Sequence, residues 1–343
     1  MIAEHPHVSV IIPNFNGMNF IDKCLLSVMR TNYPSFDVIV VDDGSTDGSD
    51  KFCERMIRDY PNLRVFKSTK NQGAAFAKNE GAKLATGEIV VFLDNDTIVD
   101  EQWLMEVINM FDSEDSIEGV QSVILNVDKP DVIQHAGIKI ISCIGVGYAI
   151  LGNTTYNADI KSQEVVPLTT ALALKRKIFM QSGGFDVDLF AYTEDIDFGW
   201  RWCLSNHKTV LAGRSKVYHP NKSPAERGSI TQRSTRSMVE NISFHLTKNS
   251  IRSILKNSEF SRLLVCIPLA ITIYLLMGMR GILTHSPSVF RGVTSGLVWN
   301  LQKLDDTLDR RIEVQSSRQM SDSEFSNLHM VSLLKMLRIW LAR

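Results

Sequence analysis

The feature that most constrains the fold of this chain is the regular alternation of short apolar runs and helical patterns over its first 125 residues. Four apolar runs predict buried strands: VSVII at 8–12, VIVV at 38–41, LRVF at 63–66 and EIVVFL at 88–93. After the first run, apolar residues recur at the three- and four-residue spacing of one helix face: Phe20, Ile21, Cys24, Leu25 and Val28. Further helices are predicted after Asp47 and over residues 73–85. This alternation predicts a parallel sheet with helices on both faces.

The composition is that of an ordinary globular protein. The chain has 343 residues, a net charge of −1, 44% hydrophobic and 22% charged residues, which argues against a disordered or nucleic-acid-binding protein. The five cysteines are odd in number and contain no CxxC pair, so we expect free buried thiols. No basic region precedes the first apolar run, which predicts no signal peptide and a cytoplasmic catalytic part.

The chain is predicted to form one domain through residue 220 and a helical region over 221–343. An uncharged run at 263–279 would be about 25 Å long as a helix, shorter than a hydrocarbon core of about 30 Å, and Pro268 would kink it. It therefore spans a membrane, lies on one, or packs against protein. Residues 328–343 predict a basic amphipathic helix, with Ser321 and Glu324 at capping-box spacing before it.

Polar residues follow three of the predicted strands. Pro13 and Asn14 follow the first strand, Asp42 and Asp43 the second, and Asp94-Asn95-Asp96 the fourth. The carboxyl ends of parallel strands meet at one edge of a sheet, where ligands bind. We therefore expect these side chains to converge around a nucleotide. Asp43 would accept a hydrogen bond from a base N–H. The alternative is that this segment only begins the next helix, with Ser45 and Asp47 as caps.

Asp94 and Asp96 repel one another at the end of a hydrophobic strand, and a divalent cation would offset that repulsion. Mg²⁺ or Mn²⁺ prefers one or two carboxylates plus phosphate oxygens, so the ion would hold a diphosphate. The alternative is a solvated turn or a helix cap, since Asp96 precedes a helical stretch. Glu194 and Asp195 begin an amphipathic helix, where they serve either as caps or as a general base. His219, at a strand end, is either structural or a nitrogen ligand.

Taken together, seven fragments between residues 8 and 220 resemble glycosyltransferase family 2, in particular its bacterial and archaeal rhamnosyltransferase-like members. In chain order they are VSVIIPNFN, VVDDGSTD, KNQGAAFAKNEGA, VVFLDNDT, SGGFD, YTEDIDFGWR and VYHP. The resemblance implies a GT-A fold, a Rossmann-like α/β fold with a mostly parallel central sheet and helices on both faces, plus a C-terminal helical extension. The catalytic domain would cover 1–220, with a nucleotide-sugar half at about 1–125 and an acceptor half at about 126–220.

The same resemblance implies a role for each matching position. It assigns the nucleoside to Pro13, Asn14 and Asp43, and the nucleotide and diphosphate to Asn71, Gly73 and Asn79. Asp94-Asn95-Asp96 looks like the family's DxD motif, with Asp96 as direct metal ligand beside Asp94 and His219. Asp195 matches the base, with Glu194 beside it, and the acceptor side would be shaped by Trp200 and Arg201.

The implied activity is inverting transfer of a sugar from a UDP-, GDP- or dTDP-sugar, with Mg²⁺ or Mn²⁺, to an acceptor hydroxyl. The acceptor would be a glycan or lipid-linked molecule at the inner face of the cell membrane, in polysaccharide, lipid-linked oligosaccharide or glycoprotein glycan synthesis. Two alternatives remain, a non-catalytic sugar-binding or scaffold protein and a sugar nucleotidyltransferase. The latter needs a Gly-rich loop with Arg, and PNFNGMN has one Gly and no Arg. No GxGxxG follows the first strand, which excludes a dinucleotide oxidoreductase.

Overall fold

The computed structural model describes residues 5–141, 143–220 and 232–330, and the chain forms two compact units. The first unit comprises Met1–Ile138, Ala149–Phe190 and His207–Asn221, and the second comprises Lys139–Tyr148, Ala191–Asn206 and Lys222–Arg343. The first unit ends close to the predicted boundary at residue 220. Two segments within the span predicted for the catalytic domain, 139–148 and 191–206, pack with the second unit.

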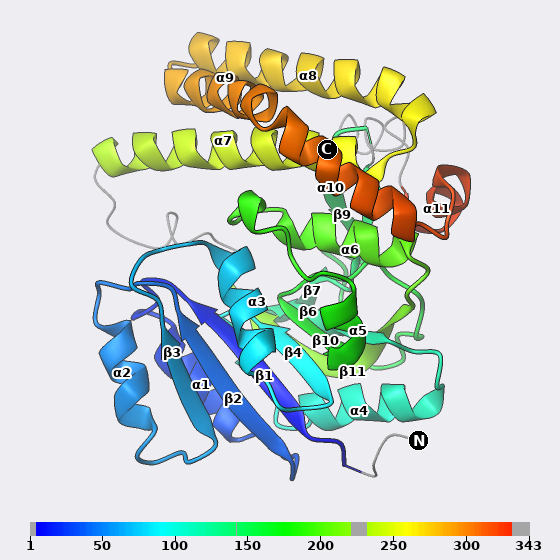
Figure 1. The fold of residues 1–343 in the computed structure, drawn as a ribbon. Coiled ribbons are helices and arrows are strands. Elements are labelled where there is room, and N and C mark those ends of the chain that lie inside the picture. Colours follow the sequence, from blue (N-terminus) through cyan, green and yellow to red (C-terminus); the bar gives the residue numbers. More distant parts are fainter. Residues whose placement is uncertain (1–4, 142, 221–231, 331–343) are drawn as a thin grey trace. The chain divides into compact units, whose positions relative to one another are not determined.

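A nine-stranded sheet forms the centre of the first unit, in the order β3-β2-β1-β4-β10-β6-β11-β5, with β7 paired to β6 (Figure 1). The strands are β1 (Val8–Asn14), β2 (Phe36–Asp42), β3 (Leu63–Lys67), β4 (Ile89–Leu93), β5 (Ile98–Val99), β6 (Gly119–Asn126), β7 (Lys129–His135), β10 (Ala171–Lys175) and β11 (Thr209–His219). The first four strands are parallel, as predicted. β10 runs antiparallel to both β4 and β6, and β11 is parallel to β6, so the sheet is mostly parallel, as predicted, with an antiparallel strand inserted at β10.

Helices cover both faces of this sheet. On one face, Val8, Val10 and Ile12 of β1 pack in one apolar cluster with α1 (Ile21–Met29), α2 (Ser49–Met56) and α4 (Trp103–Ser113). Strand side chains alternate between faces, and α3 (Ala74–Leu84) packs on β1 and β2 from the opposite side. There Gly81 lies against Ile11, where an added Cβ would be 2.3 Å from the Ile11 side chain. The short helices α5 (Arg176–Gln181) and η1 (Val187–Leu189) complete the unit.

All five cysteines are free thiols, as predicted, and four of them are buried. Burial raises the pKa of the Cys24 and Cys53 thiols to about 12. Because the thiolate is the reactive form, these two side chains are inert at neutral pH.

The second unit is helical. It contains α6 (Glu194–Leu204), α7 (Gln232–Asn257), α8 (Phe260–Leu283), α9 (Pro287–Gln302), α10 (Leu304–Ser317) and α11 (Asp322–His329). α7 and α9 pack along one another, and α8 packs on both (Figure 1). The segment 139–148 lies in a two-stranded sheet of β8 (Ile138–Ile141) and β9 (Val146–Ala149).

A buried charge cluster attaches α6 to α7. Asp197 is fully buried, and its Oδ2 accepts hydrogen bonds from Arg201 Nε at 2.9 Å and from Lys256 Nζ at 3.1 Å. Its Oδ1 accepts one from Asn257 Nδ2 at 3.1 Å. Asp197 and Arg201 belong to α6, whereas Lys256 and Asn257 belong to α7. This cluster explains why residues 191–206 group with the C-terminal helices rather than with the sheet.

The C-terminal segments agree in part with the prediction. Ser321 and Glu324 form the expected capping box, at the start of α11. The predicted amphipathic helix over 328–343 falls mostly outside the described residues, since α11 ends at His329 and the description ends at residue 330. Among the described helices, α8 is the one long and apolar enough to cross a membrane: it has 24 residues, and 17% of its most apolar window is buried. Pro268 lies within this helix.

Replacing Asp197 with Ala should destabilise the second unit strongly. The change leaves the Lys256 ammonium buried without its carboxylate, and breaking a buried ion pair typically costs about 3–5 kcal/mol. Urea denaturation measures the loss. Asp309→Ala is the control, because Asp309 is exposed on α10 and its loss should change the free energy of unfolding by less than about 0.5 kcal/mol. Equal effects of the two changes would contradict the structural role of Asp197.

Candidate functional site

The carboxamide of Asn14 joins the ends of three parallel strands. Asn14 ends β1 and is buried, and its Nδ2 donates to Asp42 Oδ1 of β2 at 2.8 Å and to Ser49 Oγ of α2 at 3.0 Å. Its Oδ1 accepts a hydrogen bond from Asn95 Nδ2, just beyond β4, at 2.8 Å. The expected convergence of strand ends is therefore present, and the Asn14 side chain itself holds it together.

Asp43 organises a loop with one carboxylate oxygen. Its Oδ2 accepts hydrogen bonds from the backbone N–H of Gln72 at 2.8 Å and of Gly73 at 2.6 Å. Asn71 Oδ1 accepts from the same Gly73 N–H at 3.0 Å. Asp43 Oδ1 is buried and makes no hydrogen bond within the described part of the chain. Burial is the main cause that raises the pKa of this carboxyl above its usual value.

Asn79 has a structural partner for both ends of its amide. Its Nδ2 donates to the Phe185 carbonyl at 2.9 Å, and its Oδ1 accepts from the Phe185 N–H at 2.9 Å. An added Cβ on the neighbouring Gly184 would lie 2.5 Å from Asn79 Oδ1, and Gly184 has a φ of +66°. The fragments KNEG and SGGFD are thus parts of one packed unit, and the predicted contact of Asn79 with a diphosphate stays a prediction.

The DND segment forms a turn that brings Asp96 to a histidine. The Asp94 carbonyl accepts hydrogen bonds from the N–H and the hydroxyl of Thr97, at 3.2 and 2.8 Å. Asp96 Oδ1 lies 3.3 Å from His219 Nε2 at the end of β11. The predicted pairing of Asp96 with His219 is therefore present in the fold, although the two residues are 123 positions apart in the chain (219 − 96).

The Asp96–His219 pair can hold a divalent ion only if oxygens of a bound diphosphate and of water complete the coordination shell of the ion. Among the described residues, no group of three or more His, Cys, Asp or Glu side chains is arranged to hold a metal ion. Mg²⁺ and related ions in phosphate sites are commonly held by one or two protein carboxylates, with phosphate and water oxygens completing the shell. Asp96 supplies one carboxylate and His219 an imidazole nitrogen, so the residues present fit an ion that arrives with a diphosphate.

The predicted acceptor-side residues lie in the second unit, on α6. Asp195 Oδ1 accepts from the N–H of Ile196 at 2.8 Å, as expected at a helix start, and Asp195 is half-buried whereas Glu194 is buried. Trp200 is fully buried, and its ring stacks on Phe325 with centroids 6.0 Å apart. Arg201 pairs with Asp197. Trp200 is therefore committed to packing, and the expected role of these residues in acceptor binding stays a prediction.

Three residues of the first unit escaped the sequence interpretation. Gly17 lies beneath the Asn14–Asn95 hydrogen bond, where an added Cβ would be 2.2 Å from Asn14 Oδ1. Lys78 is buried on α3, and its Nζ donates to Thr169 Oγ1 at 2.6 Å and lies 5.5 Å from the centroid of the Phe185 ring. Gln134 contacts His219 through both ends of its amide. The partners are distant in sequence, so no local pattern indicated these contacts.

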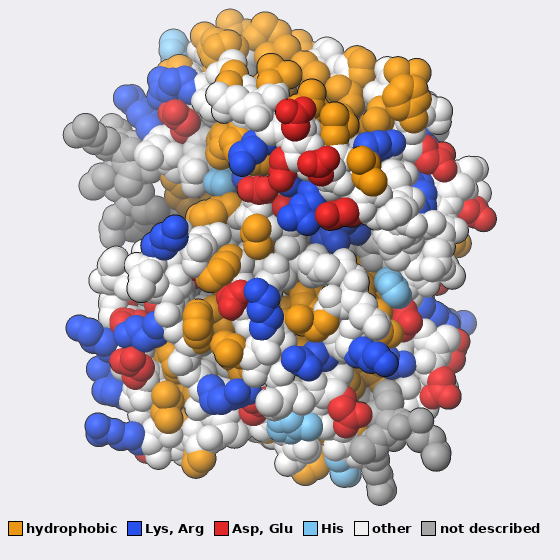
Figure 2. All heavy atoms as spheres, viewed as in Figure 1, with side chains coloured by type: hydrophobic (Ala, Val, Ile, Leu, Met, Phe, Trp, Pro, Cys, Tyr) orange, Lys and Arg blue, Asp and Glu red, His pale blue; other side chains and the backbone are white. Residues whose placement is uncertain are grey.

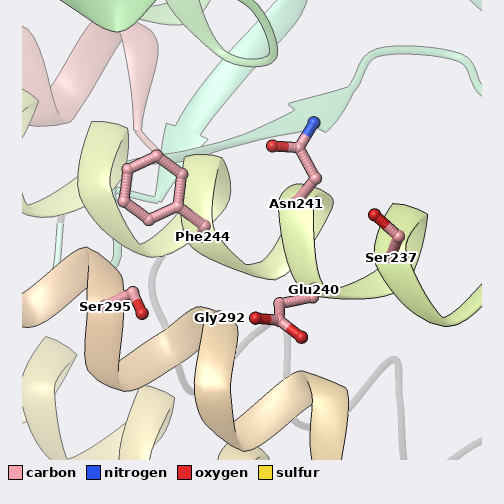
Figure 3. Close-up of a pocket in the computed structure, with 6 residues that line it drawn as sticks. All are labelled: Ser237, Glu240, Asn241, Phe244, Gly292 and Ser295. Atoms are coloured by element: carbon pink, nitrogen blue, oxygen red, sulfur yellow. The ribbon is translucent and has the colours of Figure 1, made fainter.

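A small hollow of about 260 Å³ lies in the second unit between α7 and α9 (Figure 3). Its lining residues are Ser237, Glu240, Asn241, Phe244, Gly292 and Ser295. Gly292 has no side chain to fill the space, and its Cα approaches the Glu240 carbonyl so closely that an added Cβ would be 2.3 Å away. None of the predicted site residues lines this hollow, which lies beside the close contact of the two helices at Gly292.

Comparison with known families agrees with this geometry. A model of glycosyl transferase family 2 matches residues 9–183, just over half of the chain. The chain belongs to glycosyl transferase family 2. The match covers the converging strand ends, the DND turn and most of the segment between them and Phe185. It stops before α6 and β11.

Curated relatives match a shorter stretch. The glycosyltransferase AglE of Haloferax volcanii is 39% identical over 106 residues, 30% of this chain and 35% of that protein. The glycosyltransferase GlyG of Streptococcus pneumoniae is 34% identical over 97 residues, 28% of this chain and 32% of that protein. The matched stretch thus spans about a third of each of these relatives.

Solved structures show the same fold. The mannosyltransferase PcManGT from Pyrobaculum calidifontis, in complex with GDP-Man and Mn²⁺, has a TM-score of 0.52 at 18% identity, covering 92% of this chain and 86% of that one. S. aureus TarS 1-349 with UDP-GlcNAc has a TM-score of 0.51 at 16% identity, covering 90% and 89%. This family member therefore has the predicted GT-A fold with a C-terminal helical extension.

Asp43→Asn should change the pH dependence of stability in a defined direction. The native-state pKa of Asp43 is raised, so the folded protein binds its proton more tightly than the unfolded chain, and this group makes wild-type stability fall as pH rises from about 4 toward neutrality. The amide that replaces the carboxyl group does not ionise. The stability of the variant relative to wild type should therefore increase between pH 4 and pH 7, as measured by urea denaturation.

Asp50→Asn is the matched control with the opposite sign. Hydrogen bonding to Lys67 lowers the pKa of Asp50, so its carboxylate contributes more stability as pH rises from below the unfolded-state value of about 4 to about 5. The Asp50 variant should therefore lose stability relative to wild type as pH rises to about 5, and its relative stability should change little from there to pH 7. The same trend in both variants would contradict the burial of an unpaired oxygen at Asp43.

Proposed function

We propose that this protein is an inverting glycosyltransferase, which moves a sugar from a nucleoside-diphosphate donor to an acceptor hydroxyl. The observation that carries the proposal is the Asp96–His219 pair at 3.3 Å, at the edge where the Asn14 hydrogen bonds gather the strand ends. A carboxylate and an imidazole at such an edge suit a cation that holds a diphosphate. Membership of glycosyl transferase family 2 supports the same reaction.

Mg²⁺ or Mn²⁺ is the proposed cofactor, held by Asp96 and His219 with Asp94 beside them. PcManGT and GalNAc-T7 are both solved with Mn²⁺, which favours a divalent ion in this fold without choosing between the two metals. When bound, such an ion stabilises the negative charge of a leaving diphosphate. Asp96 and His219 would orient that diphosphate, and the Asn14–Asn95 hydrogen bond would keep the turn in place.

The nucleoside is proposed to lie along Pro13, Asn14 and Asp43. The carboxylate of Asp43 is the best-supported contact, because Oδ2 is already bound to a rigid loop and Oδ1 has no hydrogen-bond donor in the described chain. A base N–H would satisfy that oxygen. Asn71 and Gly73 hold the loop that receives it. The donor is a UDP-, GDP- or dTDP-sugar, and a glycan or lipid-linked molecule is the proposed acceptor.

Asp195 is the proposed general base, which accepts the proton of the acceptor hydroxyl as the oxygen attacks the anomeric carbon. It suits this role better than Glu194, because it is the less buried of the two. A single in-line displacement with one base inverts the anomeric configuration. A retaining covalent mechanism would need a second, nucleophilic carboxylate.

Turnover of a nucleotide-sugar panel with Mn²⁺ or Mg²⁺ tests the reaction. The wild-type protein should release nucleoside diphosphate only when the metal is present. Asp96→Ala should abolish this metal-dependent turnover. Asp100→Ala is the matched control: Asp100 is a half-buried residue near the same turn whose carboxylate pairs with Lys216. Wild-type protein that binds nucleotide sugars without turnover would instead support a scaffold role.

Asp195→Asn separates binding from chemistry. Loss of a general base should lower kcat by about 10²–10⁴-fold, while the affinity for the nucleoside diphosphate stays unchanged. Binding is measured by calorimetry and kcat by product formation, with Asp309→Asn on the exposed face of α10 as control. Weaker donor binding with unchanged kcat would show that Asp195 is not the base.

We also propose that the second unit contacts the inner membrane surface in the plane of one leaflet. One side of α8 packs on protein through Cys266, Ala270, Tyr274, Gly278 and Gly281, and Tyr274 Oη donates to Ser250 Oγ of α7 at 2.7 Å. α7 buries three basic side chains: Lys248, Arg252 and Lys256. Since α7 lies alongside α8 and carries charges that are costly in hydrocarbon, a spanning arrangement is disfavoured.

The outward side of α8 and α9 supports a contact in the plane of the membrane surface. Figure 2 shows hydrophobic side chains gathered over α8 and α9. The exposed apolar residues on these helices are Phe260, Leu264, Val265, Leu276, Met277, Met279, Ile282, Leu283, Val298 and Leu301. The most apolar stretch of α8 has a mean hydropathy of 2.0, and a helix pair with such an outer face suits the boundary between headgroups and acyl chains.

Vesicle flotation tests this contact. Wild-type protein should float with vesicles that contain anionic lipid, and the double variant Leu264→Glu/Leu283→Glu should remain in the aqueous fraction. The control variant Leu26→Glu/Met180→Glu places the same charges at exposed apolar positions of the first unit and should still float. A wild-type dimer that does not float, and that the Leu264/Leu283 variant dissociates, would assign the surface to a second copy and contradict the proposal.

A further inference from the structure

Both ends of the side-chain amide of Gln134, on β7, contact His219. Its Nε2 donates to the backbone carbonyl of His219 at 2.6 Å, and its Oε1 lies 3.0 Å from His219 Nδ1. β6 pairs with both β7 and β11, and therefore fixes the two strands that carry these residues. The contact joins residues 85 positions apart, and neither the family resemblance nor the sequence pattern pointed to it.

The two hydrogen bonds together fix the tautomer of His219. A carbonyl oxygen only accepts, so the amide end that faces it must be the nitrogen. The other amide end is then the oxygen, which also only accepts, and so His219 Nδ1 must carry a hydrogen. In the neutral imidazole this leaves the lone pair on Nε2. The proton position is thus assigned from the hydrogen-bond network.

The Nε2 atom that carries this lone pair lies beside Asp96. Nε2 and Asp96 Oδ1 are 3.3 Å apart, and both are acceptors when the imidazole is neutral. A cation between them converts this repulsion into attraction. In this tautomer Nε2 can coordinate a metal ion through its lone pair, whereas a hydrogen on Nε2 would block coordination.

We infer that Gln134 is a positioning residue, which holds His219 in the Nδ1–H tautomer and so presents Nε2, beside Asp96, to the divalent ion of the donor complex. This role rests on the proposed function, because it assigns the metal site of that reaction a supporting residue. Histidines that bind metals commonly donate their second ring N–H to an acceptor, and loss of that acceptor typically lowers metal affinity about 10–100-fold. Gln134 supplies the acceptor here.

The tautomer of His219 in metal-free protein is the first readout. Nitrogen-15 NMR of the histidine side chains should show His219 with its hydrogen on Nδ1 in the wild type, with the His219 signal identified by its absence from His219→Gln. In Gln134→Met, which keeps the side-chain length but removes both hydrogen bonds, the hydrogen should shift to Nε2. Gln134→Glu keeps an acceptor for Nδ1–H and should preserve the wild-type signal.

Manganese affinity is the second readout. Electron paramagnetic resonance measures Mn²⁺ binding in the presence of UDP, GDP or dTDP, and Gln134→Met should weaken it about 10–100-fold. Gln134→Glu should retain most of the wild-type affinity. Gln315→Met is the matched control, because Gln315 is also half-buried and donates one hydrogen bond, to the Lys256 carbonyl at 2.8 Å, within the second unit. Its Mn²⁺ affinity should equal that of the wild type.

The outcomes separate this inference from the proposed function. An unchanged His219 tautomer in Gln134→Met overturns the inference and leaves the glycosyltransferase proposal standing. Equal losses of Mn²⁺ affinity in Gln134→Met and Gln315→Met also overturn it, because they reflect general destabilisation. A wild-type protein that binds no Mn²⁺ with any of the three nucleoside diphosphates contradicts the proposed function itself and removes the metal that Gln134 is inferred to serve.

Discussion

The side-chain amide of Asn14 is the interaction on which the rest of the candidate site depends. Parallel strands bring their carboxyl ends to one edge, but they do not fix the loops that follow. Asn14 does so, since it donates to Asp42 at the end of β2 and accepts from Asn95 beyond β4. Gly17 leaves room for this contact, because any Cβ there would overlap the amide groups. Asp43, Asp94 and Asp96 extend from a frame that these bonds hold rigid.

Buried and half-buried polar residues have different tasks in the two units. In the first unit, hydrogen bonds within the fold use Oδ2 of the Asp43 carboxylate and Nδ1 of the His219 imidazole. Asp43 Oδ1 and His219 Nε2 take no part in them. In the second, Asp197 is fully surrounded by Arg201, Lys256 and Asn257. The fragment YTEDIDFGWR therefore combines one carboxylate that is a structural anchor with another, Asp195, that is proposed to be a base.

Much of the fold was predictable because it follows local rules. The apolar runs became β1 to β4 in parallel register, and the three- and four-residue spacing of Ile21, Cys24, Leu25 and Val28 became the buried face of α1. The direction of β10 was not predictable, since an apolar run looks the same in parallel and antiparallel pairing. The grouping of 191–206 with the C-terminal helices was missed for a similar reason, because it depends on Lys256 and Asn257, far along the chain.

The sequence by itself determined which residues end each strand, and therefore that Asn14, Asp43 and Asp96 would lie at one edge of a sheet; strand direction and side-chain alternation are local properties. Only the tertiary structure decided which side chains are committed to contacts within the fold. Asn79 is paired with Phe185, Trp200 is buried against Phe325, and Gln134 fixes the ring of His219. These assignments depend on contacts between segments about 85 to 125 positions apart, which no local pattern encodes.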